Sequence, residues 1–268
     1  MKVIGAIAIN VFRESVRDKV LYNLVLFAML LMASSYLIGQ LTAGQDVKII
    51  KDLGLSATAI FGLFIAVFIG IGLVTKEVER RSIYSLLAKP ITRAQLIVGK
   101  YCGLTLTLAV NVAVMALALY AVLATMTYGL PPEANLVWET PPLDPAMLKA
   151  VALIFVELML VTAFALFFST FSSPMLSAAL TVGLYIVGHF SGDLRNFQQV
   201  VDSPAAARFA RGLYWVLPNL AQFDVKNEVV HGVHVPLSYM AMTGAYAAVY
   251  IAMLLAISAL VFSRRDFK

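Results

Sequence analysis

The sequence predicts an all-α integral membrane protein with six transmembrane helices, an N-terminal amphipathic interfacial helix and short outer helices before the last span. Hydrophobic residues make up 61% of the 268 residues and charged residues only 13%, whereas soluble domains carry about 25% charged residues. A soluble globule could not cover so much apolar surface. The apolar residues also form continuous runs, without the alternation of barrel strands. These observations exclude most soluble enzymes, disordered chains and nucleic-acid-binding proteins.

Each predicted span is an apolar run close to the length of about 20 residues that a helix needs to cross the hydrocarbon core. The fifth run is the shortest, and Gly99 and Gly103 form a small-residue pair that allows close helix packing at the start of the third. The six predicted spans are Val20–Leu41, Leu55–Val74, Tyr101–Thr127, Ala150–Phe168, Met175–Phe190 and Tyr239–Phe262.

The distribution of charge predicts the orientation of these spans. Thirteen of the 20 Lys and Arg residues lie before the first span, in the loop of residues 75–100 or after the sixth span, together with five acidic residues. The positive-inside rule therefore places both termini and this loop in the cytoplasm. Residues 129–145 and 191–238 then face outward. We predict a multi-pass protein of the cytoplasmic (inner) membrane, with a six-helix transmembrane domain over residues 20–268.

Residues 1–19 are predicted to form a separate amphipathic connecting helix. Apolar residues from Val3 to Val16 recur at helical spacing, and charged residues occupy the other positions. Such a helix lies in the headgroup region, with its apolar face toward the acyl chains. The alternative is a polar cap that only anchors the first span.

The loop of residues 75–100 is too charged to lie in lipid, yet it keeps an apolar helical stripe that includes Val78, Ile83 and Leu87. Pro90 is expected to end this helix, and Thr92 to cap the next one. A short amphipathic helix at the cytoplasmic surface is suited to dock into a groove of a soluble partner. A solvated turn with ordinary positive-inside charges is the alternative interpretation.

The residues of this loop also carry a resemblance. The pattern Glu77-x-Glu-Arg-x-Ser-Ile-Tyr-x-Leu-Leu87, followed by Pro-Ile-Thr-Arg93, resembles the loop of permease (transmembrane) subunits of ABC-type exporters in the ABC-2 superfamily. Arg13-Glu-Ser-x-Arg-Asp-Lys19 is similar to the connecting helix of that family, and Ser263-Arg-Arg-Asp-Phe267 to its C-terminal ending.

The resemblance implies a division of labour between chains. This chain would be a non-catalytic permease subunit, with ATP and Mg²⁺ bound by a separate ABC ATPase subunit and a second permease chain completing the complex. It has no Gly-x-x-x-x-Gly-Lys-Ser/Thr phosphate loop of its own. The implied coupling helix, which would sit in a cleft of the ATPase subunit, contains Glu77, Val78, Glu79, Arg80, Arg81, Ser82, Ile83, Tyr84, Leu86 and Leu87.

The polar residues inside the spans are the candidates for a translocation path or gate. Glu157 is the only carboxylate within a predicted span, and intramembrane charges are costly and functional candidates by default. Asn111 is a possible partner. The alternative is a protonated Glu157 that joins neighbouring helices through a hydrogen bond. His189, at the end of the fifth span, is expected near the outer face, in contact with water.

The outer loop of residues 191–238 is expected to contain two short helices. Asp202-Ser203-Pro204 is a helix start, and Asn219 is expected to cap a second helix that stops at Gly232. Asp224, Glu228, His231 and His234 are the only grouping with metal-ligand chemistry. Because Gly232 separates the two histidines, we expect ordinary loop residues there rather than a metal site.

Together these observations predict the permease subunit of an ATP-driven exporter. Its expected partners are the ATPase subunit, the second permease chain and membrane lipid, with no nucleic acid. A secondary transporter or channel is the alternative. An intramembrane enzyme fits less well, because no Gly-x-Ser-x-Gly or His-Glu-x-x-His motif is present.

Overall fold

The computed structural model describes residues 2–40, 46–79, 92–128, 140–191, 212 and 217–264, and the regular elements in these ranges are all helices. This confirms the predicted fold class. The helices are α1 (Lys2–Ser15), α2 (Lys19–Gln40), α3 (Asp46–Glu79), α5 (Arg93–Thr127), α6 (Met147–Ser169), α7 (Pro174–His189), the 3₁₀ helix η3 (Leu220–Phe223), α10 (Lys226–Val230) and α11 (Leu237–Arg264).

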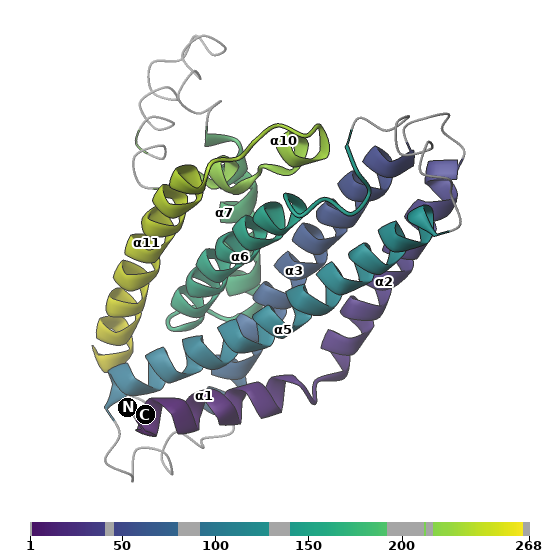
Figure 1. The fold of residues 1–268 in the computed structure, drawn as a ribbon. Coiled ribbons are helices and arrows are strands. Elements are labelled where there is room, and N and C mark those ends of the chain that lie inside the picture. The colour runs from purple at the N-terminus through teal and green to yellow at the C-terminus, as the bar shows by residue number, and fades with distance from the viewer. Residues whose placement is uncertain are drawn as a thin grey trace, which may run out of the picture.

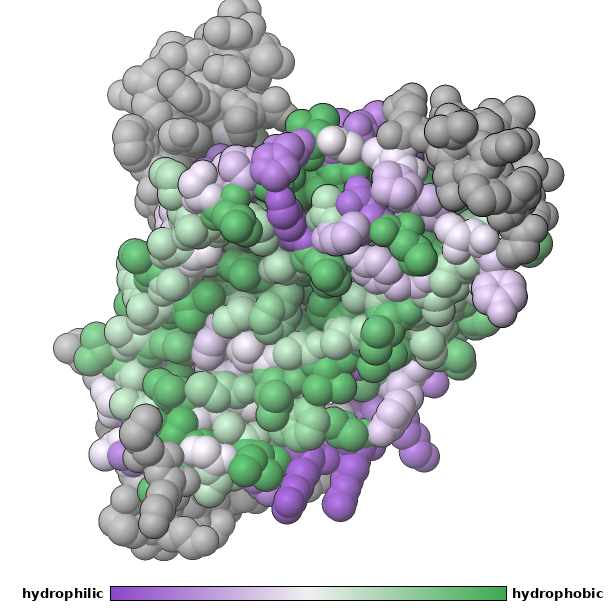
Figure 2. Space-filling model, viewed as in Figure 1, coloured by the Kyte–Doolittle hydropathy of each residue, from purple (hydrophilic) through white to green (hydrophobic). Residues whose placement is uncertain are grey.

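Five of these helices are long and apolar enough to cross a membrane, namely α2, α3, α5, α6 and α11. The fifth predicted span also forms a helix, α7, but its 16 residues reach only about 24 Å, against about 30 Å of hydrocarbon. On the face shown in Figure 2, hydrophobic residues form a broad band, with hydrophilic residues gathered above and below it. The helices thus bury an interior and still present an apolar outer surface.

The core lies where α3 and α6 pack together, and both helices have 67% of their most apolar window buried. Helix α2 packs against the outer side of α3, while α5 contacts α3, α6 and α11 (Figure 1). Helices α3 and α5 are longer than the spans predicted from the apolar runs, because they continue through charged residues at their ends.

Helix α1 crosses one end of the bundle, close to both chain termini (Figure 1). It packs against the start of α5, where Gly103 makes a close approach possible: a Cβ atom there would lie 2.6 Å from the carbonyl oxygen of Ala8 and 2.7 Å from Val11. The predicted N-terminal helix is therefore confirmed. The small-residue pair Gly99 and Gly103 contacts this helix rather than a neighbouring span.

Residues 217–236, the returning segment, fold back onto the bundle at its other end. Leu220, Phe223 and Val229 are fully buried, and η3 and α10 contact α6. Gly232, with φ of +72°, follows α10 as predicted, since glycine tolerates this left-handed conformation. The predicted cap was wrong: the Asn219 side chain accepts a hydrogen bond from Ser191 Oγ at 2.6 Å instead of capping η3. The helix start predicted at residues 202–204 lies outside the described residues.

Candidate functional site

The cytoplasmic end predicted from charge is formed by helices that continue beyond the apolar layer. Helix α3 has 34 residues, which corresponds to about 51 Å of helix. Its apolar span ends at Gly72, so residues 73–79 extend it by a further 10 Å or so. Helix α5 begins at Arg93. In the sequence, residues 80–91 thus connect the end of α3 to the start of α5.

The start of α5 is fixed by a reciprocal cap. The Gln95 backbone N–H donates to Thr92 Oγ1 at 3.3 Å, and the Thr92 backbone N–H donates to Gln95 Oε1 at 3.2 Å. This is a capping box, in which each of two otherwise unpaired backbone N–H groups donates to the side chain of the other residue. The predicted Thr92 cap is confirmed, and it marks the residue after which the continuous helix α5 begins.

Arg93 joins the same helix start to the end of the last span. Its Nη1 atom donates to the carbonyl oxygens of Phe262, at 2.7 Å, and Ser263, at 2.9 Å. The last carbonyls of a helix have no partners within it and carry partial negative charge, so a guanidinium group is well suited to bind them. Sequence reasoning missed this contact, because the partners are separated by 169 and 170 positions and nothing in the sequence indicates that they meet.

The predicted ATPase-coupling residues fall at the edge of the described chain. Glu77, Val78 and Glu79 belong to the last turn of α3. Arg80, Arg81, Ser82, Ile83, Tyr84, Leu86 and Leu87 lie outside the described residues. Their role in coupling stays a prediction.

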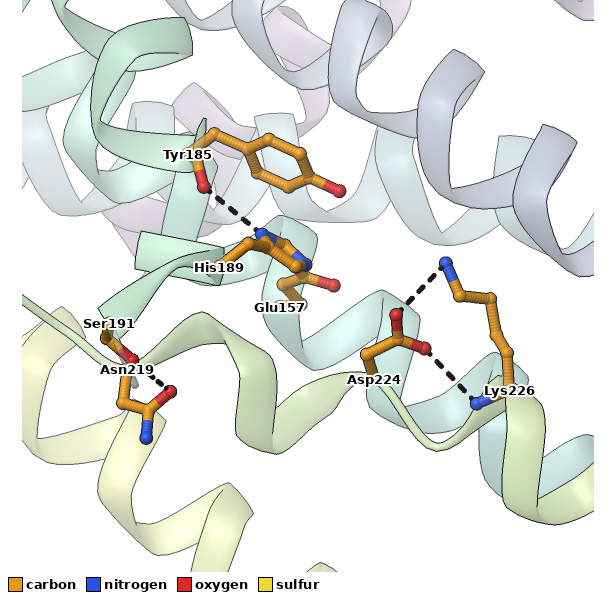
Figure 3. Close-up of polar contacts among 7 residues, drawn as sticks. All are labelled: Glu157, Tyr185, His189, Ser191, Asn219, Asp224 and Lys226. Carbon is orange, nitrogen blue, oxygen red and sulfur yellow. Dashed lines mark hydrogen bonds and ion pairs between the residues drawn. The ribbon is translucent and has the colours of Figure 1, made fainter. Parts of the chain in front are cut away.

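A second candidate site surrounds Glu157, which lies within α6 and is only 3% exposed (Figure 3). His189, the last residue of α7, places its Nε2 atom 3.3 Å from Glu157 Oε1. The other ring nitrogen, Nδ1, lies 3.1 Å from the carbonyl oxygen of Tyr185, one turn earlier. The rings of Tyr185 and His189 are also in contact, with centroids 4.5 Å apart. The intramembrane carboxylate thus faces an imidazole on the neighbouring helix.

This contact differs from the expectations for both candidates. Asn111 is buried, but its amide donates to the Thr107 carbonyl in its own helix at 2.7 Å. It makes no hydrogen bond to Glu157. His189, expected to be wet, is 23% exposed, and it also packs against Glu157, which was not expected. The two side chains come from consecutive helices, α6 and α7, and periodicity within either helix could not reveal the pair.

The returning segment brings two charges to the same site (Figure 3). Lys226 Nζ lies 3.4 Å from Asp224 Oδ2, and the Lys226 backbone N–H donates to Asp224 Oδ1 at 3.2 Å. His231 and His234 do not join them: His231 contacts the carbonyl oxygen of Asn227, and His234 is exposed. Within the described ranges, no three His, Cys, Asp or Glu side chains are grouped to hold a metal ion.

A buried lysine of α3, which sequence analysis did not single out, links this helix to the returning segment through Thr140. Lys51 is fully buried, and its Nζ donates to Thr140 Oγ1 at 2.9 Å and to the Pro141 carbonyl at 2.8 Å. Thr140 Oγ1 in turn donates to the carbonyl of Val230 at 3.4 Å. Lys149 of α6 adds a hydrogen bond to the Val235 carbonyl at 2.7 Å. Side chains from α3 and α6 therefore both hold the end of this segment.

The architecture defines a multi-pass membrane component with its polar chemistry at two ends of one bundle. Residues 5–267 match the family described as ABC-2 family transporter protein, so the chain belongs to the ABC-2 transporter family. No curated protein matches the sequence. As a member of this family, the chain is a transport permease of the ABC type.

Proposed function

We propose that this chain is the transmembrane subunit of an ATP-driven exporter, and that a separate ABC ATPase subunit binds ATP and Mg²⁺. The observation that carries the proposal is the family match over residues 5–267. In the proposed complex, residues 77–87 dock into the ATPase subunit at the cytoplasmic face. A second permease chain completes the translocation path.

The geometry at this end supports a mechanical role for the docked segment. The segment is followed directly by the Thr92 cap and the rigid helix α5. Arg93 links α5 to the end of α11, and Gly99 and Gly103 hold α1 against α5. A displacement of residues 77–87 would therefore be passed to the N-terminal helix α1, the third span and the last span together. Alternating access then becomes a shift of population between inward and outward states, biased by the nucleotide state of the partner.

The proposal is tested by charge reversal in the coupling segment. The double substitution Glu77→Lys and Glu79→Lys should reduce co-purification of the ATPase subunit and reduce the ATPase rate of the reconstituted complex by at least about tenfold, which corresponds to 1.4 kcal/mol of coupling. Glu14→Lys is the matched control, because Glu14 is an exposed carboxylate on α1 at the same end of the molecule. The proposal fails if the double variant and the control retain the same partner binding and the same ATPase rate.

A further inference from the structure

The contact between Glu157 and His189 contains an unpaired group. Glu157 Oε1 is buried and has no hydrogen-bond partner, although His189 Nε2 lies 3.3 Å away. The two atoms are close enough for an ion pair. Buried polar atoms without partners are rare in proteins, and each one calls for an explanation.

The other nitrogen of His189 fixes the chemistry of this contact. Nδ1 lies 3.1 Å from the carbonyl oxygen of Tyr185. A carbonyl oxygen can only accept, so the hydrogen-bond network assigns a proton to Nδ1. In a neutral ring, Nε2 then carries a lone pair. This nitrogen lies 3.3 Å from a carboxylate oxygen, and two acceptors so close in a buried site repel each other unless a proton or a cation lies between them.

We infer that Glu157 and His189 together bind a single exchangeable proton, which joins the end of α7 to α6. In one form the proton is on Glu157 Oε1 and is donated to Nε2. In the other it is on Nε2, and an imidazolium faces a carboxylate. The inference goes beyond the proposed transport role and does not depend on an ATPase partner.

A proton fits this site better than a metal ion. Glu157 and His189 supply two ligand atoms, and in the described part of the chain no third His, Cys, Asp or Glu is grouped with them so as to hold a metal ion. Protein metal sites with imidazole and carboxylate ligands generally hold three or four protein ligands. The site therefore lacks the ligand number that would make a cation preferable to a proton.

The groups that face the pair are Tyr185 from α7, Asp224 after η3 and Lys226 from α10. Asp224 and Lys226 are paired with each other, so their fields at Glu157 oppose one another. Polar groups on the other packed helices make their contacts elsewhere: Lys51 with Thr140, Asn111 with Thr107, and Tyr246 with the Asn219 backbone.

The proton has a route to water on the side of the returning segment. His189 is 23% exposed and Asp224 is 38% exposed, while Glu157 behind them is 3% exposed. Loss of the proton would leave two acceptors facing each other, and α7 would then separate from α6 at this point. Protonation from the side of the returning segment thus sets how tightly the end of α7 is held.

Nuclear magnetic resonance of the histidine nitrogens tests this directly, because the chain has only three histidines. The full chain, carrying His231→Gln and His234→Gln and labelled with ¹⁵N-histidine, is reconstituted in phospholipid nanodiscs at neutral pH. We expect His189 to show a protonated Nδ1 and an Nε2 that shares a proton. Glu157→Ala should convert Nε2 to an unbonded acceptor. Glu228→Gln, which alters an exposed carboxylate of α10, should change neither signal.

Glu157→Gln provides a variant of nearly unchanged size. Its amide can donate to Nε2 but cannot exchange a proton with it, so the hydrogen-bonded signal should persist and lose its dependence on pH across about pH 5 to 8. The inference is overturned if Nε2 is the same in the parent and Glu157→Ala proteins, or if Nδ1 carries no proton. Addition of stoichiometric Zn²⁺ after chelator treatment should leave the signals of the parent protein unchanged. A signal from metal-bound Nε2 would also overturn the inference.

Discussion

Lys51 shows what a single buried charge does in this protein. Its ammonium group is fully enclosed, yet it donates to a hydroxyl and a carbonyl outside its own helix. Burial of a cation is unfavourable unless such partners replace water. The side chain therefore joins α3 to residues 140–141, which belong to the predicted outer stretch 129–145, and Thr140 in turn contacts α10.

Replacement of Lys51 by Met is expected to lower the free energy of unfolding by about 1–3 kcal/mol, because the buried Thr140 hydroxyl would lose its hydrogen-bond donor. Thermal unfolding of the purified protein in one detergent measures the change. Lys19→Met is the control, since Lys19 is exposed at the start of α2. Equal midpoints for the two variants would show that the Lys51 contacts do not hold the fold together.

At the scale of the elements, close packing of α1 against α5 depends on Gly103. Gly103→Ala should destabilise the docked α1 by about 1–3 kcal/mol, since the added methyl group would overlap the Ala8 carbonyl and Val11. Gly5→Ala on α1 meets open space and should stabilise the helix by about 0.5–1 kcal/mol. Hydrogen exchange of the α1 amides reports both effects. Slower or unchanged exchange in Gly103→Ala would contradict the packing described.

The contact between Arg93 and the end of α11 gives a second prediction at this scale. Arg93→Gln should release the final turn of α11, at a cost of about 1–2 kcal/mol, because hydrogen bonds to a charged group are lost at a partly exposed site. Faster hydrogen exchange confined to the last turn of α11 is the expected signature. Arg13→Gln, on an exposed position of α1, is the control and should leave exchange in that turn unchanged. Unchanged exchange in Arg93→Gln as well would show that the contact does not stabilise the end of α11.

The cores of the spans could be predicted from the sequence, because a helix in lipid needs a continuous apolar run. Their ends could not, since a capped helix such as α5 continues through charged residues once its N–H groups are satisfied. Glu157 stood out as a carboxylate within a span. Its neighbour His189 did not, because that contact depends on how α7 lies against α6, and no spacing along the chain encodes it.

At the scale of the whole molecule, the orientation of the bundle follows from charge and is open to chemical labelling. Cys102 is the only cysteine, so a Cys102→Ser background is free of thiols. On that background, Glu228→Cys should react with a membrane-impermeant maleimide in intact cells. Glu14→Cys should react only after permeabilisation. The reverse pattern would contradict the predicted orientation and, with it, the docking of residues 77–87 to a cytoplasmic ATPase.

The short helix α7 has a mechanical consequence. Because its last residue meets Glu157, α7 ends about 15 Å before the Met147 end of α6. The returning segment packs against this end of α7 and against α6, in short pieces. Displacing a few short turns breaks far fewer backbone hydrogen bonds than unwinding a continuous spanning rod. Movement of the returning segment at the end of α7 would therefore leave the backbone hydrogen bonds of the long spans intact.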